Sequence, residues 1–189
     1  KLTTGIDGDA NGAILTNFKT GSYTLINNCD FNKDFTISCW VYIPKDTTLS
    51  TGNSSYLFGT TTADNCQGGF RVTLRQTTDG YGLNVASSSS NALLTYTDKI
   101  DTDTWHNVVL VREGNYFLLY VDSYLISTTI ISDDANFINT ALSFGAYVGE
   151  KWDYHNGVIA YDNIMIFAKS IDSNGIATIY KEKMWLGGR

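Results

Sequence analysis

Basic residues are few and scattered in this chain. It has 13 lysines and arginines against 19 aspartates and glutamates, so its formal net charge is −6. A surface that binds nucleic acid needs lysine and arginine clustered on one face to neutralise phosphates, and the sequence contains no such cluster. We therefore exclude nucleic acid as a partner.

Long apolar segments are also missing. The sequence contains no run of about 18 apolar residues that could span a bilayer, so we expect no membrane insertion. The chain begins Lys1-Leu2-Thr3-Thr4, without the apolar centre of a signal peptide. From this start we expect a mature protein or an excised module.

Cysteine is rare, with Cys29, Cys39 and Cys66 alone in the chain. Three cysteines cannot all pair within one chain, and their spacing does not fit a zinc site, which needs close pairs of ligands. We expect buried thiols, with Cys39 in the core. A bond between Cys29 and Cys66 stays open, because a sequence does not supply the distance between them.

Proline occurs once, at Pro44, whereas threonine, serine, tyrosine, valine and isoleucine are abundant. The 17 glycines are spread among turn signals such as Asp79-Gly80. This composition is typical of an all-β protein. A length of 189 residues with 17% charged residues is sufficient for one large core, so we expect a single domain over residues 1–189.

Two blocks carry the strongest strand pattern. In FTISCWVYIP, from Phe35 to Pro44, the apolar residues of one face alternate with a second set that includes a tryptophan and a tyrosine, which predicts an internal strand. In TWHNVVLVREGNYFLLYVDSYL, from Thr104 to Leu125, two apolar segments flank Glu113-Gly114-Asn115, which predicts a hairpin.

Shorter strands and one helix complete the prediction. The other expected strands are Ile14–Leu15, Tyr23–Ile26, Tyr56–Thr60, Gly69–Gln76, Gly82–Ala86, Leu93–Thr97, Leu125–Ile131, Thr140–Val148 and Gly157–Ala168. Near the end, Asp172 or Ser173 can cap a helix that places Ile176, Ile179 and Tyr180 on one side. We expect this helix to dock on the edge of a β-sandwich.

The order of these segments resembles the laminin-G-like or concanavalin A-like jelly-roll superfamily, in its bacterial and phage branch of lectin-like modules. The segments that carry the resemblance are Phe35–Pro44, Trp105–Val111, Leu119–Ser123 and Tyr161–Phe167. The resemblance implies an antiparallel β-sandwich of jelly-roll type with a short C-terminal helix. One departure is Ser123, which stands after Asp122 where the family usually has glycine, so the turn must accept a side chain.

Enzymes similar to this family are glucanases that use two glutamates in E-x-D-x-x-E. The glutamates of this chain are Glu113, Glu150 and Glu182, which the predicted elements keep apart, so we expect no glycosidase. His106 stands in the W-H-N-V-V block without a nucleophile motif nearby, which favours a hydrogen-bonded structural histidine over a catalytic one. We expect no enzyme.

Two places could bind a sugar. In the strand FRVTLR, Arg71, Thr73 and Arg75 share one face, where two guanidinium forks could bind an acidic sugar such as a sialic acid or a uronate. The alternative is a salt-bridged outer face.

The second place is the connection AYVGEKWDYHNG, whose candidate ligand-binding residues are Tyr147, Trp152, Tyr154 and His155. The resemblance adds Tyr81 and Asn84 as neighbours on the sheet. The alternative for these aromatics is packing of the loop onto the sandwich.

Calcium is expected from the resemblance, which implies a structural Ca²⁺ at Asp162, with Asn28 and Asp30 as partners across the edge. Separately, Asp7 to Gly12 has the D-x-D-x-N-G start of a calcium loop, but Phe18 stands where a bidentate glutamate belongs. A solvated glycine turn is the favoured interpretation of that segment.

These observations predict a non-catalytic carbohydrate-binding module, extracellular or on a cell or virion surface. Its expected ligand is an oligo- or polysaccharide, and its expected role is to hold a larger enzyme or adhesin on a glycan. The alternative is a receptor-binding or structural domain of a surface or phage tail protein, which would use the same sandwich for a protein contact.

Overall fold

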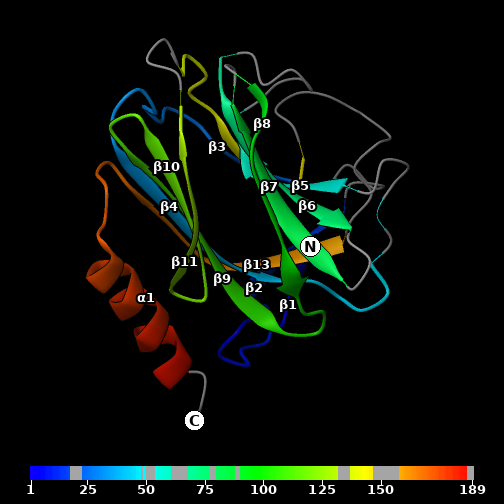
Figure 1. Cartoon of the computed structure of the whole chain (residues 1–189). Helices are drawn as coiled ribbons and strands as arrows, with labels where there is room; N and C mark the ends of the chain where they lie inside the picture. The colour runs from blue at the N-terminus through cyan, green and yellow to red at the C-terminus, as the bar shows by residue number, and fades with distance from the viewer. Residues whose placement is uncertain are drawn as a thin grey trace.

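Two antiparallel sheets pack face to face in the computed structural model, as the sequence predicts (Figure 1). The structure describes residues 1–17, 23–47, 49, 54–60, 68–76, 80–87, 90–131, 137–146 and 158–186, with the backbone alone for residues 54, 90–99 and 184–186. The fold is an all-β sandwich of jelly-roll type with a C-terminal helix. No helix in these ranges is long and apolar enough to cross a membrane.

One sheet has seven strands in the order β1-β2-β13-β4-β9-β10-β11. These strands are β1 (Leu2–Thr3), β2 (Ala13–Asn17), β13 (Val158–Phe167), β4 (Phe35–Tyr42), β9 (Trp105–Glu113), β10 (Tyr116–Val121) and β11 (Tyr124–Ile130). The predicted internal strand is confirmed, since β4 lies between β13 and β9. The predicted hairpin is also confirmed, with Glu113 opposite Tyr116.

The other sheet has six strands in the order β3-β12-β5-β6-β7-β8. These strands are β3 (Thr24–Ile26), β12 (Leu142–Phe144), β5 (Ser54–Gly59), β6 (Phe70–Gln76), β7 (Tyr81–Ser87) and β8 (Ser90–Ile100). All of its strand pairs are antiparallel. The two strand orders show that the chain crosses between the sheets several times, for example from β4 to β5 and from β8 to β9.

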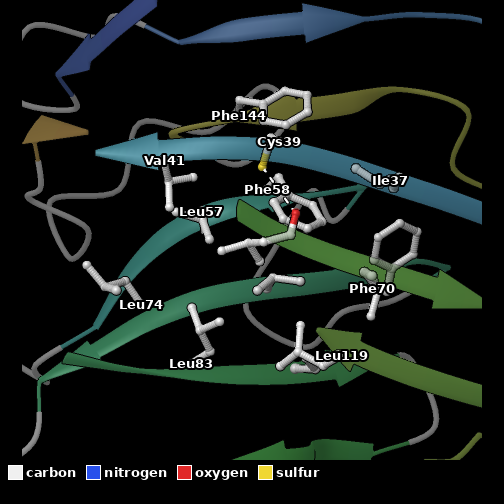
Figure 2. Close-up of a cluster of buried hydrophobic side chains, with 14 of the residues drawn as sticks. Ile37, Cys39, Val41, Leu57, Phe58, Phe70, Leu74, Leu83, Leu119 and Phe144 are labelled. Carbon is white, nitrogen blue, oxygen red and sulfur yellow. Dashed lines mark hydrogen bonds between the residues drawn. The ribbon is translucent and has the colours of Figure 1, made fainter. Parts of the chain in front are cut away.

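The core lies between the sheets (Figure 2). The inward residues of β4, among them Ile37, Cys39 and Val41, are at most 1% exposed. They meet β5 and β6 from the facing sheet, including Leu57 and Phe70. The alternation predicted for β4 is therefore correct, and so is the placement of Cys39 in the core.

Phe70 lies at the centre of an aromatic cluster that joins the two sheets. Its ring centroid is 5.1 Å from that of Phe35, 5.4 Å from Phe31, 5.6 Å from Phe137 and 5.8 Å from Phe117. Phe35 and Phe117 belong to the seven-stranded sheet, whereas Phe70 belongs to the six-stranded sheet. The cluster therefore fixes the two layers against each other.

The helix α1 (Ser173–Leu186) covers part of the outer face of the seven-stranded sheet, as Figure 1 shows. Asp172 caps it, since its Oδ1 accepts the Gly175 N–H at 2.8 Å, so the predicted cap is confirmed. Ile176 is fully buried against Val109, Val111 and Tyr120. The expected docking on the sandwich edge is wrong. Ile176 and Tyr180 pack instead on outward side chains of the interior strands β4, β9 and β10.

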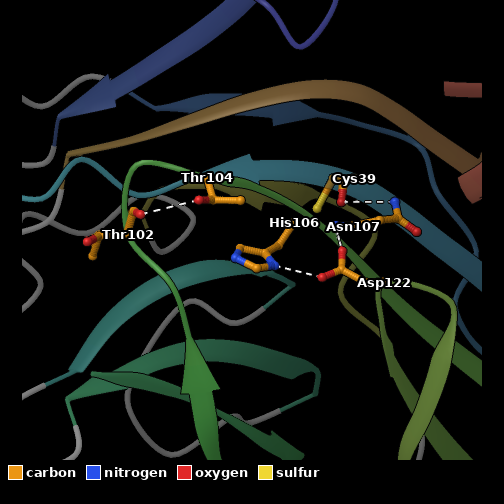
Figure 3. A network of polar contacts seen from close by, with 6 residues as sticks. All are labelled: Cys39, Thr102, Thr104, His106, Asn107 and Asp122. Atoms are coloured by element: carbon orange, nitrogen blue, oxygen red, sulfur yellow. Dashed lines mark hydrogen bonds and ion pairs between the residues drawn. The ribbon is translucent and has the colours of Figure 1, made fainter. Parts of the chain in front are cut away.

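The turn between β10 and β11 accepts a side chain at position 123, as the sequence requires. Asp122 and Ser123 both have positive φ, at 50° and 71°, the conformation of a type I′ hairpin turn. The Asp122 carboxylate accepts the Asn107 N–H at 2.8 Å and lies 2.7 Å from Nδ1 of His106, which Figure 3 shows side by side. His106 is therefore hydrogen-bonded as predicted, and it joins β9 to the turn.

The His106–Asp122 contact predicts a pH-dependent stability. Burial lowers the pKa of His106, but the hydrogen bond and charge of Asp122, together with Asp101, outweigh it and raise the pKa above its ordinary value. A raised folded-state pKa favours the charged imidazole, so this stabilisation is complete below about pH 6.5 and is lost as the pH rises through the folded pKa. We expect His106→Asn to lose more unfolding free energy at acidic than at alkaline pH, in urea titrations of both proteins. An equal loss at every pH would contradict the charged contact.

Two cysteines lie in the described part of the chain. Cys29 and Cys39 both have free thiols, and burial raises the pKa of each. Cys66 lies outside the described residues.

Candidate ligand-binding groove

An open groove of about 460 Å³ lies on the outer face of the seven-stranded sheet. Leu15, Val158 and Ala160 form its apolar floor, and the rings of Tyr42 and Trp105 stand beside them. Tyr42 follows Trp40 by two residues along β4, so it points to the same face, just beyond the residue against which α1 stacks.

The register of four strands creates this groove. Trp105 of β9 is opposite Tyr42 of β4, Tyr42 is opposite Ala160 of β13, and Ala160 is opposite Leu15 of β2. Directly opposite residues in antiparallel strands share one face of the sheet, so these four side chains form a continuous row. Two small or branched residues in that row leave the space beside the two aromatic rings.

Tyr42 and Trp105 form a tilted pair, with ring centroids 5.5 Å apart and an interplanar angle of 48°. The Tyr42 hydroxyl donates to Oδ1 of Asp103 at 3.1 Å, and the Lys45 N–H donates to the same oxygen at 2.9 Å. Burial, followed by the hydrogen bond and charge of Asp103, raises the pKa of Tyr42, so the phenol stays protonated at neutral pH. The pair therefore presents a fixed, uncharged aromatic wall.

The end of β1 and the segment after it form the opposite wall, through Thr3, Thr4 and Gly5. The Ile6 N–H donates to Oδ2 of Asp162 at 2.9 Å, which holds this segment against β13. A Cβ on Gly5 would lie 2.7 Å from that oxygen, so a larger residue here would displace the Asp162 carboxylate. The groove thus has an aromatic side and a side lined by two threonines and a glycine.

The predicted calcium ligands do not come together. Asp162 accepts backbone N–H groups from Ile6 and Asn163 in the seven-stranded sheet. Asp30 accepts the Asn32 N–H, next to Phe31, whose carbonyl oxygen accepts from Arg112 at 2.8 Å. Arg112 is opposite Phe35 and Asp162 is opposite Trp40, so roughly 17 Å of β4 separates the two positions.

A calcium site made of Asp162, Asn28 and Asp30 therefore does not fit this fold. Asn28 belongs with Asp30, because the N–H of Cys29 between them donates to Thr140 beside the six-stranded sheet. Within the described ranges no group of three His, Cys, Asp or Glu side chains could hold a metal ion. In the glycine turn after β1, the Asp7 carboxylate forms an ion pair with Lys183 of α1.

The predicted arginine face exists on the other sheet. Phe70, Val72 and Leu74 point into the core, so Arg71, Thr73 and Arg75 share the outer face of β6. Asn84 is opposite Thr73 in β7, and its carbonyl oxygen accepts from the Thr73 hydroxyl at 3.4 Å. The structure thus brings Arg71, Thr73, Arg75 and Asn84 onto one face, although Thr73 is only 6% exposed.

Tyr81 does not join them. Its side chain belongs to the core cluster, is 8% exposed, and donates its hydroxyl to the Thr47 carbonyl oxygen at 2.7 Å. The prediction of Tyr81 as a ligand-binding neighbour on the sheet surface is corrected, because Tyr81 lies on the inward side of β7 with Leu83 and Val85. The predicted loop residues Tyr147, Trp152, Tyr154 and His155 lie outside the described residues.

The described glutamates are not arranged for glycoside hydrolysis. Glu113 ends β9, and Glu182 lies in α1. Glu150 is outside the described residues. The His106–Asp122 contact ties β9 to a turn, and burial raises the pKa of the neighbouring core thiol, Cys39, far above its ordinary value, which suppresses a thiolate nucleophile.

Tyr42 and Trp105 were not predicted as site residues. Each belongs to a block that the sequence identifies as a strand, and the outward phase of Tyr42 is visible in the alternation of FTISCWVY. A large aromatic on the outward face of an internal strand is the signal that points to this surface.

A comparison with protein-family models assigns this chain to a family. A family model described as the concanavalin A-like lectin/glucanases superfamily matches residues 18–177. A comparison with curated protein sequences finds no match.

Solved structures share the fold. The botulinum neurotoxin serotype D binding domain superposes with a TM-score of 0.67 at 19% identity, over 92% of this chain and 43% of that chain. The serotype D ligand binding domain in complex with N-acetylneuraminic acid gives 0.66 at 18% identity, over 92% and 42%. A heptameric SAP-like pentraxin from Limulus polyphemus gives 0.64 at 12% identity, over 84% and 74%. The chain spans less than half the length of these neurotoxin domains.

Proposed function

The chain belongs to the concanavalin A-like lectin/glucanase superfamily, and from this premise we propose that it is a non-catalytic carbohydrate-binding domain. Its role is to hold a larger secreted or surface protein on an oligo- or polysaccharide. The similar domains are described as binding domains of neurotoxins, and one was solved with N-acetylneuraminic acid, which supports a glycan as ligand for this fold.

The observation that carries the proposal is the Tyr42–Trp105 pair in its groove. A volume of about 460 Å³ falls among the roughly 300–1,000 Å³ of ordinary small-molecule sites. Sugars place their apolar C–H face on aromatic rings, while nearby hydroxyl groups exchange hydrogen bonds with the sugar hydroxyls. The groove offers both, with threonine hydroxyls opposite the rings.

A glycan array with the wild-type domain and a Trp105→Ala variant tests the proposal. We expect wild-type binding to at least one glycan, with affinity at least about tenfold weaker in the variant, since a central aromatic anchor contributes more than about 1.4 kcal/mol. Trp105 is half-buried at the start of β9, so the melting temperature should change little. Unchanged binding by Trp105→Ala would show that the binding site lies outside this groove. Binding to no glycan would contradict the proposed function.

A protein contact is the second candidate, favoured by the apolar surface of the β10–β11 hairpin. Tyr124 is 75% exposed, Ile130 66% and Leu125 50%, and Tyr116 stands opposite Ile130 at 47%. Tyr124 and Leu125 lie beside the turn, and Tyr116 and Ile130 lie at the other end of the hairpin; exposed apolar side chains of this size are common at protein interfaces. This function becomes the leading one if the array shows no glycan.

A further inference from the structure

We propose that the groove recognises an uncharged pyranose and discriminates against acidic sugars. The inference rests on the proposed function and names the ligand class of the same site. It is carried by the chemistry of the groove lining and by the carboxylates that stand directly behind two of its walls.

The described part of the lining is uncharged at neutral pH. Its described residues are threonine, glycine, proline, aromatic and aliphatic residues, and none of them has an ionisable side chain other than the phenol of Tyr42. Recognition of a carboxylate generally relies on an arginine fork or a lysine aimed at the ligand. The groove instead presents ring faces and hydroxyl groups, which match the C–H face and the neutral hydroxyls of a pyranose.

Two carboxylates oppose an anionic ligand. Asp103 accepts the Tyr42 hydroxyl at 3.1 Å, and Asp162 holds the Ile6 N–H at 2.9 Å, behind the Gly5 wall. Each carboxylate directly contacts the lining or its neighbour, Asp103 through Tyr42 and Asp162 through Ile6 beside Gly5. These contacts are shorter than the roughly 8 Å over which physiological salt screens charges. An acidic sugar in the groove would have a carboxylate behind each of these two walls and no arginine or lysine in the described lining to pair with.

Cations also lie near the rim, but none of them belongs to the described lining. Lys183 is paired with Asp7, and the side chain of Lys45 is exposed to solvent beyond Pro44. The Lys1 amino group donates to the carbonyl oxygen of the lining residue Leu15 at 3.3 Å, so, like the two carboxylates, it lies one contact behind the described lining. Arg71 and Arg75 are on the outer face of the other sheet, on the far side of the core. Among the described residues these two arginines are the basic pair that shares one strand face, so binding of an acidic sugar there would be sensitive to Arg75.

The experiment compares neutral oligosaccharides with sialylated and uronate-containing glycans on one array, for the whole chain, the Trp105→Ala variant and two further variants. Ala160→Leu adds bulk to the groove floor without removing an aromatic contact, and Arg75→Ala is the matched change on the opposite sheet. We expect neutral glycans to bind, Ala160→Leu to weaken binding by at least about tenfold, and Arg75→Ala to change it less than about twofold. Unchanged melting temperatures show that both variants are folded.

The outcomes separate the two proposals. Binding of acidic glycans that Arg75→Ala weakens and Ala160→Leu leaves unchanged would overturn the inference while keeping the carbohydrate function. Neutral binding insensitive to both Ala160→Leu and Trp105→Ala would also overturn the groove as the site. Binding to no glycan of either class would reject the proposed function and the inference together.

Discussion

Replacement of Phe70 by alanine should lower the free energy of unfolding by about 3–5 kcal/mol, the range for large aromatic side chains removed from a core. Phe70 is fully buried, and its ring contacts those of Phe31, Phe35, Phe117 and Phe137. Phe35 and Phe117 belong to the facing sheet, whereas Phe31 and Phe137 lie in connecting segments, so no single element can collapse into the space that the ring leaves. The cavity would therefore stay largely open, and most of the expected loss of unfolding free energy would remain.

Urea titration and calorimetry measure this effect. For a chain of this length each kcal/mol corresponds to about 2–4 °C, so the melting temperature should fall by roughly 10 °C. Phe70→Leu is the control, because it keeps an apolar side chain of similar volume and should cost less than about 1.5 kcal/mol. Since the groove is on the outer face of the other sheet, Phe70→Leu should keep its ligand affinity. A loss below about 1 kcal/mol in Phe70→Ala would show that the aromatic cluster contributes little.

Period-two alternation explains why the sheets could be predicted. In β4 one face is buried in the core and the other lies under α1 or beside the groove, so the pattern from Phe35 onward predicts the strand almost to its observed end at Tyr42. A different signal, Gly114, marks the turn of the β9–β10 hairpin, where the backbone has a φ of 55°. Short strands that pair over few residues leave a weaker pattern. The two-residue strand Leu2–Thr3, which helps to wall the groove, was not predicted.

Pairing between strands explains why the groove was not predicted. Tyr42, Trp105 and Ala160 meet only through the register of β4 with β9 and β13, and a sequence does not specify which strands become neighbours. The same limit applies to calcium, since Asp162 and Asp30 could be judged only by their separation in the fold. Tyr81 is different. Its inward phase is present in YGLNVAS, where it alternates with Gly82 and Asn84.

Replacement of Trp40 by alanine should cost a further large amount, about 3–5 kcal/mol, and should release the helix. Trp40 is fully buried on the outer face of β4, and its ring stacks on Tyr180 with centroids 5.3 Å apart at 16°. Ile176 and the Lys183–Asp7 ion pair are the other attachments of α1 described above, and a partly exposed ion pair contributes at most about 1 kcal/mol. The stacked rings therefore provide much of the docking energy.

Hydrogen exchange distinguishes release of the helix from general loss of stability. In Trp40→Ala, amides of residues 176–186 should exchange at a higher rate than those of β4 and β9, because a helix without its docking face opens locally. Trp40→Phe keeps an aromatic partner for Tyr180 and should retain most of the protection. Trp40 and Tyr42 are successive outward residues of one strand, so Trp40→Ala should also loosen the aromatic wall of the groove and weaken glycan binding, whereas Lys183→Ala should leave binding nearly unchanged. Uniform exchange across helix and sheet in Trp40→Ala would mean that α1 and the sandwich unfold as one unit.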